Sequence, residues 1–194
     1  MSKQAFRSIL DISNSYRNGE LSPVAVIDSC LKQVEKFDSK LGAFQALYAE
    51  DAREAAQAAE KAYQSGHRIG PFHGIPFALK DLIDIKGRIT TGGSKVMSKR
   101  TSPGTATIAR RLLAAGGILI GKTKTVEVAM GGWGTNKHMG TPWNPWDLNI
   151  PRTPGGSSSG SAVSVAAGLA GCAVGTDTGG SVRLPSAWCG IVGL

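Results

Sequence analysis

The stretch TATIARRLLAAGGILI, residues 105–120, contains a helical pattern that is followed at once by a short apolar run. It predicts a helix over residues 105–115 and a strand over residues 117–120. The same order recurs further along the chain, where we expect a small-residue helix over 159–169 and a strand over 172–175. Strands that alternate with helices are typical of α/β proteins with a partly parallel sheet.

The N-terminal half of the chain extends this pattern. Residues 75–79 form another short apolar run and predict a buried strand. Ser22 can cap a helix, Pro23 suits its first turn, and apolar residues follow at helical spacing. Residues 49–64 are rich in Ala, Glu and Lys and stop at a Ser-Gly turn, which predicts a second helix. We therefore expect an α/β fold with a mixed, partly parallel sheet flanked by helices.

The composition is that of a globular protein. The 194 residues are 41% hydrophobic and 19% charged, which excludes the disordered and collagen-like classes and favours a single domain. The 22 Lys and Arg residues outnumber the 14 Asp and Glu residues, which gives a net charge of +8. Because the basic residues are scattered singly or in pairs without interleaved aromatic residues, they do not establish contact with nucleic acid.

Targeting signals and cysteines bear on the compartment. Every apolar run is shorter than the ~20 residues that span a membrane, and residues 1–20 contain no secretory signal. Cys30, Cys172 and Cys189 are odd in number and widely spaced, which fits a reduced compartment better than a disulfide framework. We expect a cytoplasmic protein with no membrane contact.

The last six residues, CGIVGL at 189–194, form an apolar and strand-like run. Natural chain ends are usually polar, and an unpaired apolar strand invites association. This run predicts that the domain is truncated. We therefore expect the 194-residue chain alone to be marginally stable or to associate, and to be poorly active.

The segment GGILIGKT at Gly116–Thr123 matches the phosphate-loop pattern G-x-x-x-x-G-K-[ST]. In a nucleotide-binding protein the residues between the glycines form a loop whose N–H groups surround the phosphates, and a strand comes before that loop. Here Ile118, Leu119 and Ile120 are expected to be the strand itself, and a helix comes before them. Nucleotide binding is therefore a distant alternative function.

Two Ser/Gly-rich segments are the candidates for chemistry. The run PGGSSSGS at 154–161 leads into the helix expected over 159–169, and helix N-termini favour developing negative charge. The run GTDTGGSVR at 175–183 follows a strand, and its turn would expose a serine hydroxyl beside several backbone N–H groups, as an oxyanion site requires. Taken alone, each run is more often a turn than a site, and the composition of the first also fits a flexible linker. Together they predict a nucleophilic serine.

A nucleophilic serine needs a base. His67, His73 and His138 lie in expected loops without a recognisable serine-hydrolase context. Lys80 comes directly after the apolar run 75–79, and burial there would lower the pKa of its amine from about 10.4 by disfavouring the ammonium form. The alternative is a surface ion pair of Lys80 with Asp81 or Asp84.

Lys80 in the segment ALKD, the run GGSSSGSA at 155–162 and the run GTDTGGSVRLP at 175–185 together resemble the amidase signature family. GTPWNPWD at 140–147 and WCGIVGL at 188–194 are similar to it as well. The resemblance extends from about Ser22 to the end of the chain. It implies that residues 1–194 are the N-terminal portion of a single amidase-signature domain. That portion would have a helical segment over about 1–66, a catalytic core from about 70 onward and a missing C-terminal part.

The resemblance also assigns roles to individual residues. It implies a Ser–cis-Ser–Lys triad with Ser181 as the nucleophile, Ser157 after a cis peptide bond as the bridging serine, and Lys80 as the base. The remaining implied positions are the oxyanion-hole N–H groups of Thr178, Gly179, Gly180 and Ser181, and the supporting side chains of Ser158, Asp177 and Arg183. Position 159 is Ser where many members of the family have Gly, and this difference leaves the triad intact.

The implied activity is amidase activity, in which an acyl-enzyme forms and a carboxamide C–N bond is hydrolysed to release ammonia or an amine. The reaction needs a small-molecule amide as substrate but neither a cofactor nor a metal, and the family resemblance allows a homodimer. The alternative within the family is the A subunit of the glutamyl-tRNA(Gln)/aspartyl-tRNA(Asn) amidotransferase, a glutaminase, which alone would bring a nucleic-acid partner. We favour the plain hydrolase because GGWGTNKH at 131–138 resembles general amidases more closely.

Overall fold

The computed structural model describes residues 7–194. The first six residues of the expected helical segment 1–66, which also begin the stretch searched for a secretory signal, lie outside the described residues. The described part contains six α-helices, a short 3₁₀ helix and four strands. In chain order these are α1 (Ile9–Arg17), α2 (Pro23–Leu41), β1 (Phe44–Leu47), α3 (Ala49–Gln64), β2 (Pro76–Lys80), α4 (Thr107–Ala114), β3 (Ile118–Thr123), η1 (Glu127–Ala129), α5 (Ser159–Ala166), β4 (Cys172–Val174) and α6 (Arg183–Cys189).

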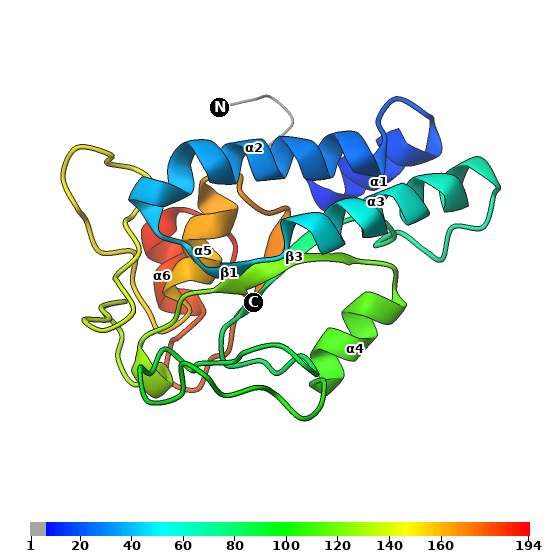
Figure 1. The fold of residues 1–194 in the computed structure, drawn as a ribbon. Coiled ribbons are helices and arrows are strands. Elements are labelled where there is room, and N and C mark those ends of the chain that lie inside the picture. The colour runs from blue at the N-terminus through cyan, green and yellow to red at the C-terminus, as the bar shows by residue number, and fades with distance from the viewer. Residues whose placement is uncertain (1–6) are drawn as a thin grey trace.

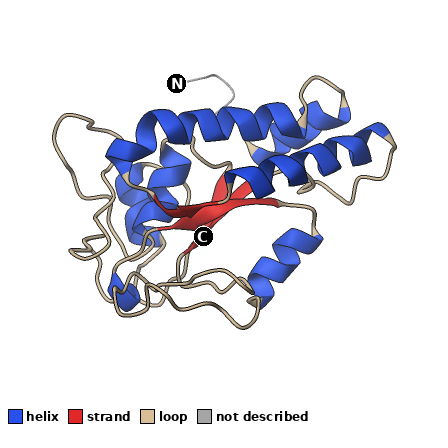
Figure 2. Ribbon diagram, in the orientation of Figure 1, coloured by secondary structure: helices blue, strands red, loops and turns tan. Residues whose placement is uncertain are grey.

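The four strands form one mixed sheet in the order β1-β3-β2-β4 (Figure 2). Strand β2 lies at its centre and is parallel to both of its neighbours, β3 and β4. Strand β1 runs antiparallel to β3 at one edge. The predicted α/β class, with a mixed and partly parallel sheet between helices, is confirmed.

Helices cover both faces of the sheet (Figure 1). On one face, α2, α3 and α5 share a core with Ala78 of β2 and Ile120 of β3. On the other face, Phe77 and Leu79 of β2 pack with Ala109 of α4. Because side chains alternate along a strand, Lys80 at the end of β2 lies on the same face as Ala78, toward α5. No helix in the part from residue 7 to 194 has the length and hydropathy needed to cross a membrane.

The longest helix, α2, begins where the sequence predicts, whereas its end was not predicted. The Ser22 hydroxyl accepts the N–H of Ala25 at 3.1 Å, which satisfies one free donor of the first turn. Pro23 occupies the first turn, and Gly42 ends the helix in the left-handed conformation with φ of 59°. The pattern of capping residue, proline and glycine thus fixes both ends of the helix.

Four elements of the described part were not predicted, namely α1, β1, η1 and α6. The expectation for the last residues of the chain was wrong. The run at 189–194, which we expected to be strand-like, begins with the last residue of α6, and Gly190 ends that helix with φ of 70°. Residues 191–194 contain no strand within the described part of the chain. Apolar composition alone could not distinguish a strand from a short helix followed by a tail.

The phosphate-loop hypothesis for Gly116–Thr123 is also wrong. Most of this segment is strand β3, which follows helix α4 and pairs with β2 along its length. The lysine that would face a phosphate, Lys122, is fully buried and forms an ion pair with Asp81 at 2.8 Å. An extended backbone in a sheet cannot bend its N–H groups around a phosphate group.

Candidate functional site

Lys80 is a fully buried lysine at the carboxyl end of the central strand. Its Nζ lies 2.7 Å from the Ser157 hydroxyl and 2.9 Å from the Thr176 hydroxyl, with the Thr176 carbonyl at 3.4 Å. Burial lowers the pKa of Lys80 to about 8, although the nearby Asp177 carboxylate acts in the opposite direction. About one tenth of the amine is therefore uncharged at pH 7, and this form can accept a proton.

The surface ion pair that we considered for Lys80 is absent. Among the described residues, Asp81 pairs with Lys122, and Asp84 pairs with Arg100 at 2.8 Å. Consecutive residues of a strand point to opposite faces, so the side chain of Asp81 is directed away from that of Lys80. Lys80 is instead surrounded by neutral oxygen atoms.

Ser157 lies in the loop before α5, where hydrogen bonds hold both its hydroxyl and its backbone carbonyl. The Gly156–Ser157 peptide bond is cis, as the family resemblance implies. The Ser157 side chain is fully buried, and its carbonyl accepts the N–H of Val126 at 3.2 Å and the hydroxyl of Thr125 at 3.0 Å. The Ser/Gly run 154–161 is buried throughout and continues into α5, so it is not a flexible linker.

Ser158 joins the two Ser/Gly-rich segments. Its N–H donates to the carbonyl of Ser181 at 3.1 Å. Its hydroxyl accepts the N–H of Thr176 at 3.2 Å and donates to the Thr176 carbonyl at 3.3 Å. Segments that lie about twenty residues apart in the sequence are thereby placed side by side, next to Lys80.

The half-buried Ser181 lies on the wall of a cavity of about 460 Å³. This cavity is the candidate active site, because Ser181 lines it together with Thr176, whose hydroxyl contacts the buried Lys80 amine. Its other lining residues are Val128, Ala129, Met130, Gly131, Gly132, Gly156, Thr176, Thr178, Gly179, Gly180 and Leu184.

The loop that carries Ser181 is organised by Asp177. Its carboxylate accepts the N–H groups of Gly180 at 2.6 Å, Val182 at 3.0 Å and Arg183 at 3.1 Å. The Arg183 guanidinium also binds both carboxylate oxygens, at 2.9 and 3.0 Å, and together these donors hold the pKa of Asp177 well below its usual range. Asp177 therefore remains an anion at any physiological pH and keeps the loop closed.

The four N–H groups expected in an oxyanion hole differ in their surroundings. The Gly180 N–H is directed at Asp177 rather than at the cavity. Within residues 7–194, the N–H groups of Thr178, Gly179 and Ser181 donate no hydrogen bond to the protein. These three are therefore the donors that are free to bind a ligand in the cavity.

The histidines do not replace Lys80 as a base. His73 is buried and its Nδ1 accepts the N–H of Ile69 at 3.0 Å, while His67 lies on the surface beside Ser65. His138 lines a separate cavity of about 260 Å³. In the described part of the chain, no group of three or more His, Cys, Asp or Glu side chains could hold a metal ion.

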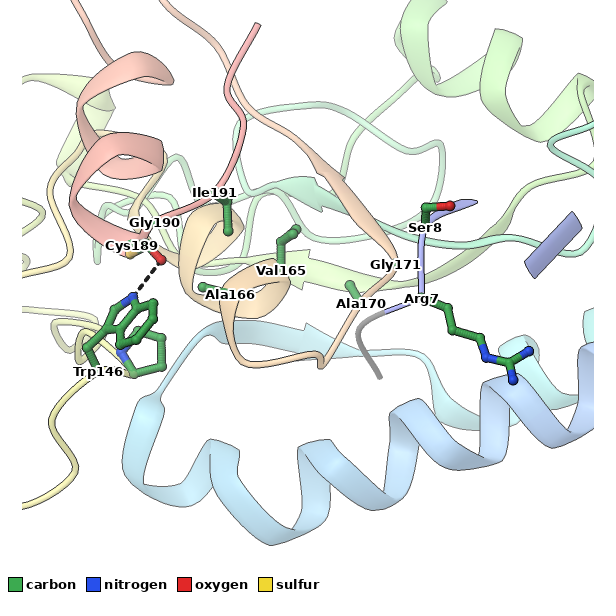
Figure 3. A pocket seen from close by; sticks show the side chains of 11 residues that line it. Arg7, Ser8, Trp146, Val165, Ala166, Ala170, Gly171, Cys189, Gly190 and Ile191 are labelled. Atoms are coloured by element: carbon green, nitrogen blue, oxygen red, sulfur yellow. Dashed lines mark hydrogen bonds between the residues drawn. The ribbon is translucent and has the colours of Figure 1, made fainter. Parts of the chain in front are cut away.

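A larger cavity of about 550 Å³ lies beside α5 and the end of α6 (Figure 3). The indole of Trp146 closes one side of it and donates to the carbonyl of Cys189 at 2.8 Å. Its walls are mostly aliphatic. Among its described lining residues, Ser8 carries a hydroxyl and Arg7 carries a charge. The Ser8 hydroxyl donates to the Asp11 carboxylate at 2.7 Å and accepts the Asp11 N–H at 3.1 Å, so it caps the first turn of α1. This capping role accounts for the serine, and the size of the cavity does not make it a catalytic site.

Comparison with known proteins identifies the relatives of this chain. The Amidase family profile matches residues 25–194. The glutamyl-tRNA(Gln) amidotransferase of Anaeromyxobacter dehalogenans (strain 2CP-C) has an A subunit that is 45% identical over 174 residues, which are 90% of this chain and 35% of that protein.

Solved structures of amidases are also similar to this chain. A crystal structure of an amidase superposes with a TM-score of 0.86 at 37% identity, covering 93% of this chain and 41% of the other. The peptide amidase from Stenotrophomonas maltophilia superposes with a TM-score of 0.87 at 34% identity, covering 95% and 39%. The chain thus spans less than half the length of each of these relatives.

Several residues of the site were missed by sequence analysis. Thr176 contacts Lys80 directly, and Thr125 holds the carbonyl of Ser157. Thr176 lies inside the predicted site segment 175–183, so its place in GTDTGGS was the available signal. Nothing in the sequence around Thr125 indicates its role, because its partner is 32 residues away.

We predict that Asp177→Asn loosens the loop that carries Ser181, because the substitution removes the charge and one of the two oxygen acceptors. Because a carboxylate binds N–H groups more strongly than an amide oxygen does, amide hydrogen exchange of Val182 and Arg183 should accelerate about tenfold or more. The matched control is Asp147→Asn, which removes a carboxylate that accepts two N–H groups and an arginine in another loop. Unchanged exchange at Val182 and Arg183 in Asp177→Asn would contradict the prediction.

Proposed function

The chain belongs to the amidase family, and from this membership we propose that it hydrolyses a carboxamide with Ser181 as nucleophile, Ser157 as bridging serine and Lys80 as base. The observation that carries the proposal is the 2.7 Å contact between the buried Lys80 amine and the Ser157 hydroxyl. A lysine that is shielded from water and placed on a serine is suited to remove a proton. The placement of Ser181 in the neighbouring cavity supports its role as the nucleophile.

The proposed reaction begins with a proton relay. Uncharged Lys80 takes the hydroxyl proton of Ser157, and Ser157 takes the proton of Ser181 as the Ser181 oxygen attacks the amide carbonyl. The relay requires the Ser181 hydroxyl to come within hydrogen-bond distance of the Ser157 hydroxyl when the substrate is bound. The proton then returns along the relay to the leaving amine, and water hydrolyses the acyl-enzyme.

The developing oxyanion would be bound by backbone donors. The N–H groups of Thr178, Gly179 and Ser181 support this role because they have no protein partner in the described residues. Gly180 would join them only by leaving Asp177, so we propose it as the weakest of the four. One such donor typically contributes a factor of about 10²–10³ in rate.

The organisation of the chain supports the proposal of one domain. Helices α2 and α3 of the helical segment share a single hydrophobic core with α5, which follows the bridging serine. We therefore propose that residues 1–194 belong to one amidase-signature domain rather than to a helical domain and a separate catalytic one. We also propose a cytoplasmic location, on the ground of the three unpaired cysteines.

We predict that Ser181→Ala abolishes amide hydrolysis by the full chain, meaning the complete enzyme of which we propose residues 1–194 to be the N-terminal portion. Lys80→Ala should nearly abolish it, because one substitution removes the nucleophile and the other the base. The measurement is release of ammonia from simple carboxamides. Ser159→Gly is the control, since the Ser159 hydroxyl makes only a 3.5 Å contact with a backbone carbonyl and should leave activity near wild type. Substantial residual activity in folded Ser181→Ala would refute the assignment.

We predict that kcat/KM for a neutral amide rises with pH, with a midpoint near 8. The folded-state pKa of Lys80 is lowered to about 8, so the amine is a base above that pH and an inactive ammonium below it. The midpoint is measured from kcat/KM between pH 6 and 10, because kcat/KM reports the pKa of the free enzyme. A profile that is flat or falls across this range would show that Lys80 is not the base.

A second function within the family is supported by the names of the relatives. Two A subunits of glutamyl-tRNA(Gln) amidotransferases are 45% and 41% identical to this chain. In this second function the same serine would release ammonia from glutamine for a partner protein. The resemblance of residues 131–138 to general amidases favours the plain hydrolase.

We predict that the full chain hydrolyses simple carboxamides without any partner and that glutamine is not a preferred substrate. Assays with and without charged tRNA and an amidotransferase B subunit distinguish the two functions. Glutaminase activity that depends on tRNA and on the B subunit would reverse the choice. Activity on simple amides that these additions leave unchanged would support the plain hydrolase.

A further inference from the structure

A second buried lysine, Lys122 of β3, forms an ion pair with Asp81 on the side of the sheet opposite to Lys80. The Lys122 Nζ lies 2.8 Å from Asp81 Oδ1, and the two side chains are 0% and 1% exposed. Lys122 also donates to the Thr90 hydroxyl at 2.9 Å, and Asp81 Oδ2 accepts the N–H of Thr91 at 3.1 Å. Each charge therefore has both an ionic and a neutral hydrogen-bonding partner.

Stability is a weak explanation for such a pair. The cost of removing two charges from water often equals or exceeds their attraction, and well-packed apolar residues in their place are frequently as stable. What distinguishes this pair is its position, since Asp81 directly follows the proposed base.

The pair fixes the end of the strand that carries Lys80. In the parallel register, Leu79 is opposite Lys122 and Lys80 is opposite Thr123. The N–H of Asp81 donates to the carbonyl of Thr123 at 2.9 Å, which extends the ladder one residue beyond Lys80. Asp81 is therefore held to β3 both by its backbone and by its carboxylate.

The same aspartate supports a wall of the cavity. Its carbonyl accepts the N–H of Gly92 at 2.7 Å, and the carbonyl of Gly92 accepts the N–H of Val128 at 2.7 Å. Val128 lines the cavity that contains Ser181. Two hydrogen bonds thus separate the residue beside the base from the wall that a substrate would touch.

We propose that Asp81 and Lys122 are positioning residues, which hold the Lys80 amine and the Val128 wall in register while placing no net charge beside the base. The proposal rests on the proposed amidase function. Neither side chain touches the cavity, so both act through Lys80 and the loop at residues 91–93.

The other charged groups around Lys80 are few in the part of the chain that the structure describes. Asp177 acts on it from the loop after β4, and α5 contributes serine hydroxyls but no charge. Lys124, just beyond β3, interacts with Asp38. Removal of one member of the Asp81–Lys122 pair therefore leaves a new unbalanced charge close to Lys80, with a sign set by which member is removed.

The test uses opposite pH shifts in the full chain. Lys122→Met leaves the Asp81 carboxylate, still bonded to Thr91, and this anion favours the ammonium form of Lys80. The midpoint of kcat/KM should rise by about one pH unit. Asp81→Asn leaves the Lys122 cation, and the midpoint should fall by a similar amount.

The double variant carries neither charge, so its midpoint should return to the wild-type value. Its kcat should still fall by about tenfold or more at nearly unchanged KM, because the base is less well placed.

Matched controls come from the neighbouring pair of Asp84 and Arg100, which is on the surface with side chains 31% and 41% exposed. Asp84→Asn and Arg100→Met should leave the midpoint unchanged, because solvent screens that pair. A shift of similar size in these controls would overturn the proposal, since it would show that any nearby charge has the same effect.

The remaining outcomes separate this proposal from the proposed function. Wild-type midpoints in both folded single variants, with an active wild type, would overturn the positioning role and leave the amidase function standing. Activity retained in Ser181→Ala would overturn both. If the single variants do not fold, the double variant decides: a folded double variant with lowered kcat supports the proposal, and one with wild-type kcat overturns it. If the double variant does not fold either, the pair serves folding and the proposal is overturned.

Discussion

The structure depends on the burial of one amine, that of Lys80. A lysine ammonium in the interior loses its hydration, and here no carboxylate of the described residues is in contact with it to compensate for that loss. The surroundings instead provide the hydroxyls of Ser157 and Thr176, which can hydrogen-bond to a neutral amine as acceptor or donor. The fold thus stabilises the form of lysine that can act as a base at moderate pH.

The two faces of the central sheet carry different kinds of polar group. On the face of β2 toward α5 lie the neutral oxygens that surround Lys80, whereas on the opposite face the Asp81–Lys122 pair holds the strand end. The alternation of side chains along a strand makes this separation possible within two consecutive residues. A charged pair on the same face as Lys80 would instead compete with the serines for its amine.

The sequence predicted the elements whose signals are local. The start of α2 follows from its capping serine and proline, and the extent of α3 follows from its helix-favouring composition and the Ser-Gly turn after it. The strands β2, β3 and β4 follow from short apolar runs. The strand β1 has no β-branched residue and exists because it pairs with β3, while α6 contains Pro185 in its first turn, which weakened its helical signal. The role of Lys122 as a buried ion-pair partner was not predicted, since a lysine after glycine fits both a phosphate loop and a buried strand.

The site itself could not be predicted from local signals. Lys80 contacts Ser157, which is 77 residues away in the sequence, and Thr176, which is 96 residues away. Only the family resemblance predicted that Lys80 and Ser157 lie together, and nothing predicted the contact with Thr176. The Asp81–Lys122 pair spans 41 residues and joins two strands whose register the sequence does not specify.

Of the 26 glycines, 18 lie in residues 98–194, and this enrichment has a packing explanation. A Cβ at Gly160 would lie 2.2 Å from the carbonyl oxygen of Ala43, and one at Gly175 would lie 2.7 Å from the Ser158 hydroxyl oxygen. Small residues therefore let α5 and the loop after β4 approach the sheet closely enough for Ser157 to reach Lys80. Larger residues at these positions would push the bridging serine away from the base. The composition that suggests a flexible linker is thus what a densely packed site requires.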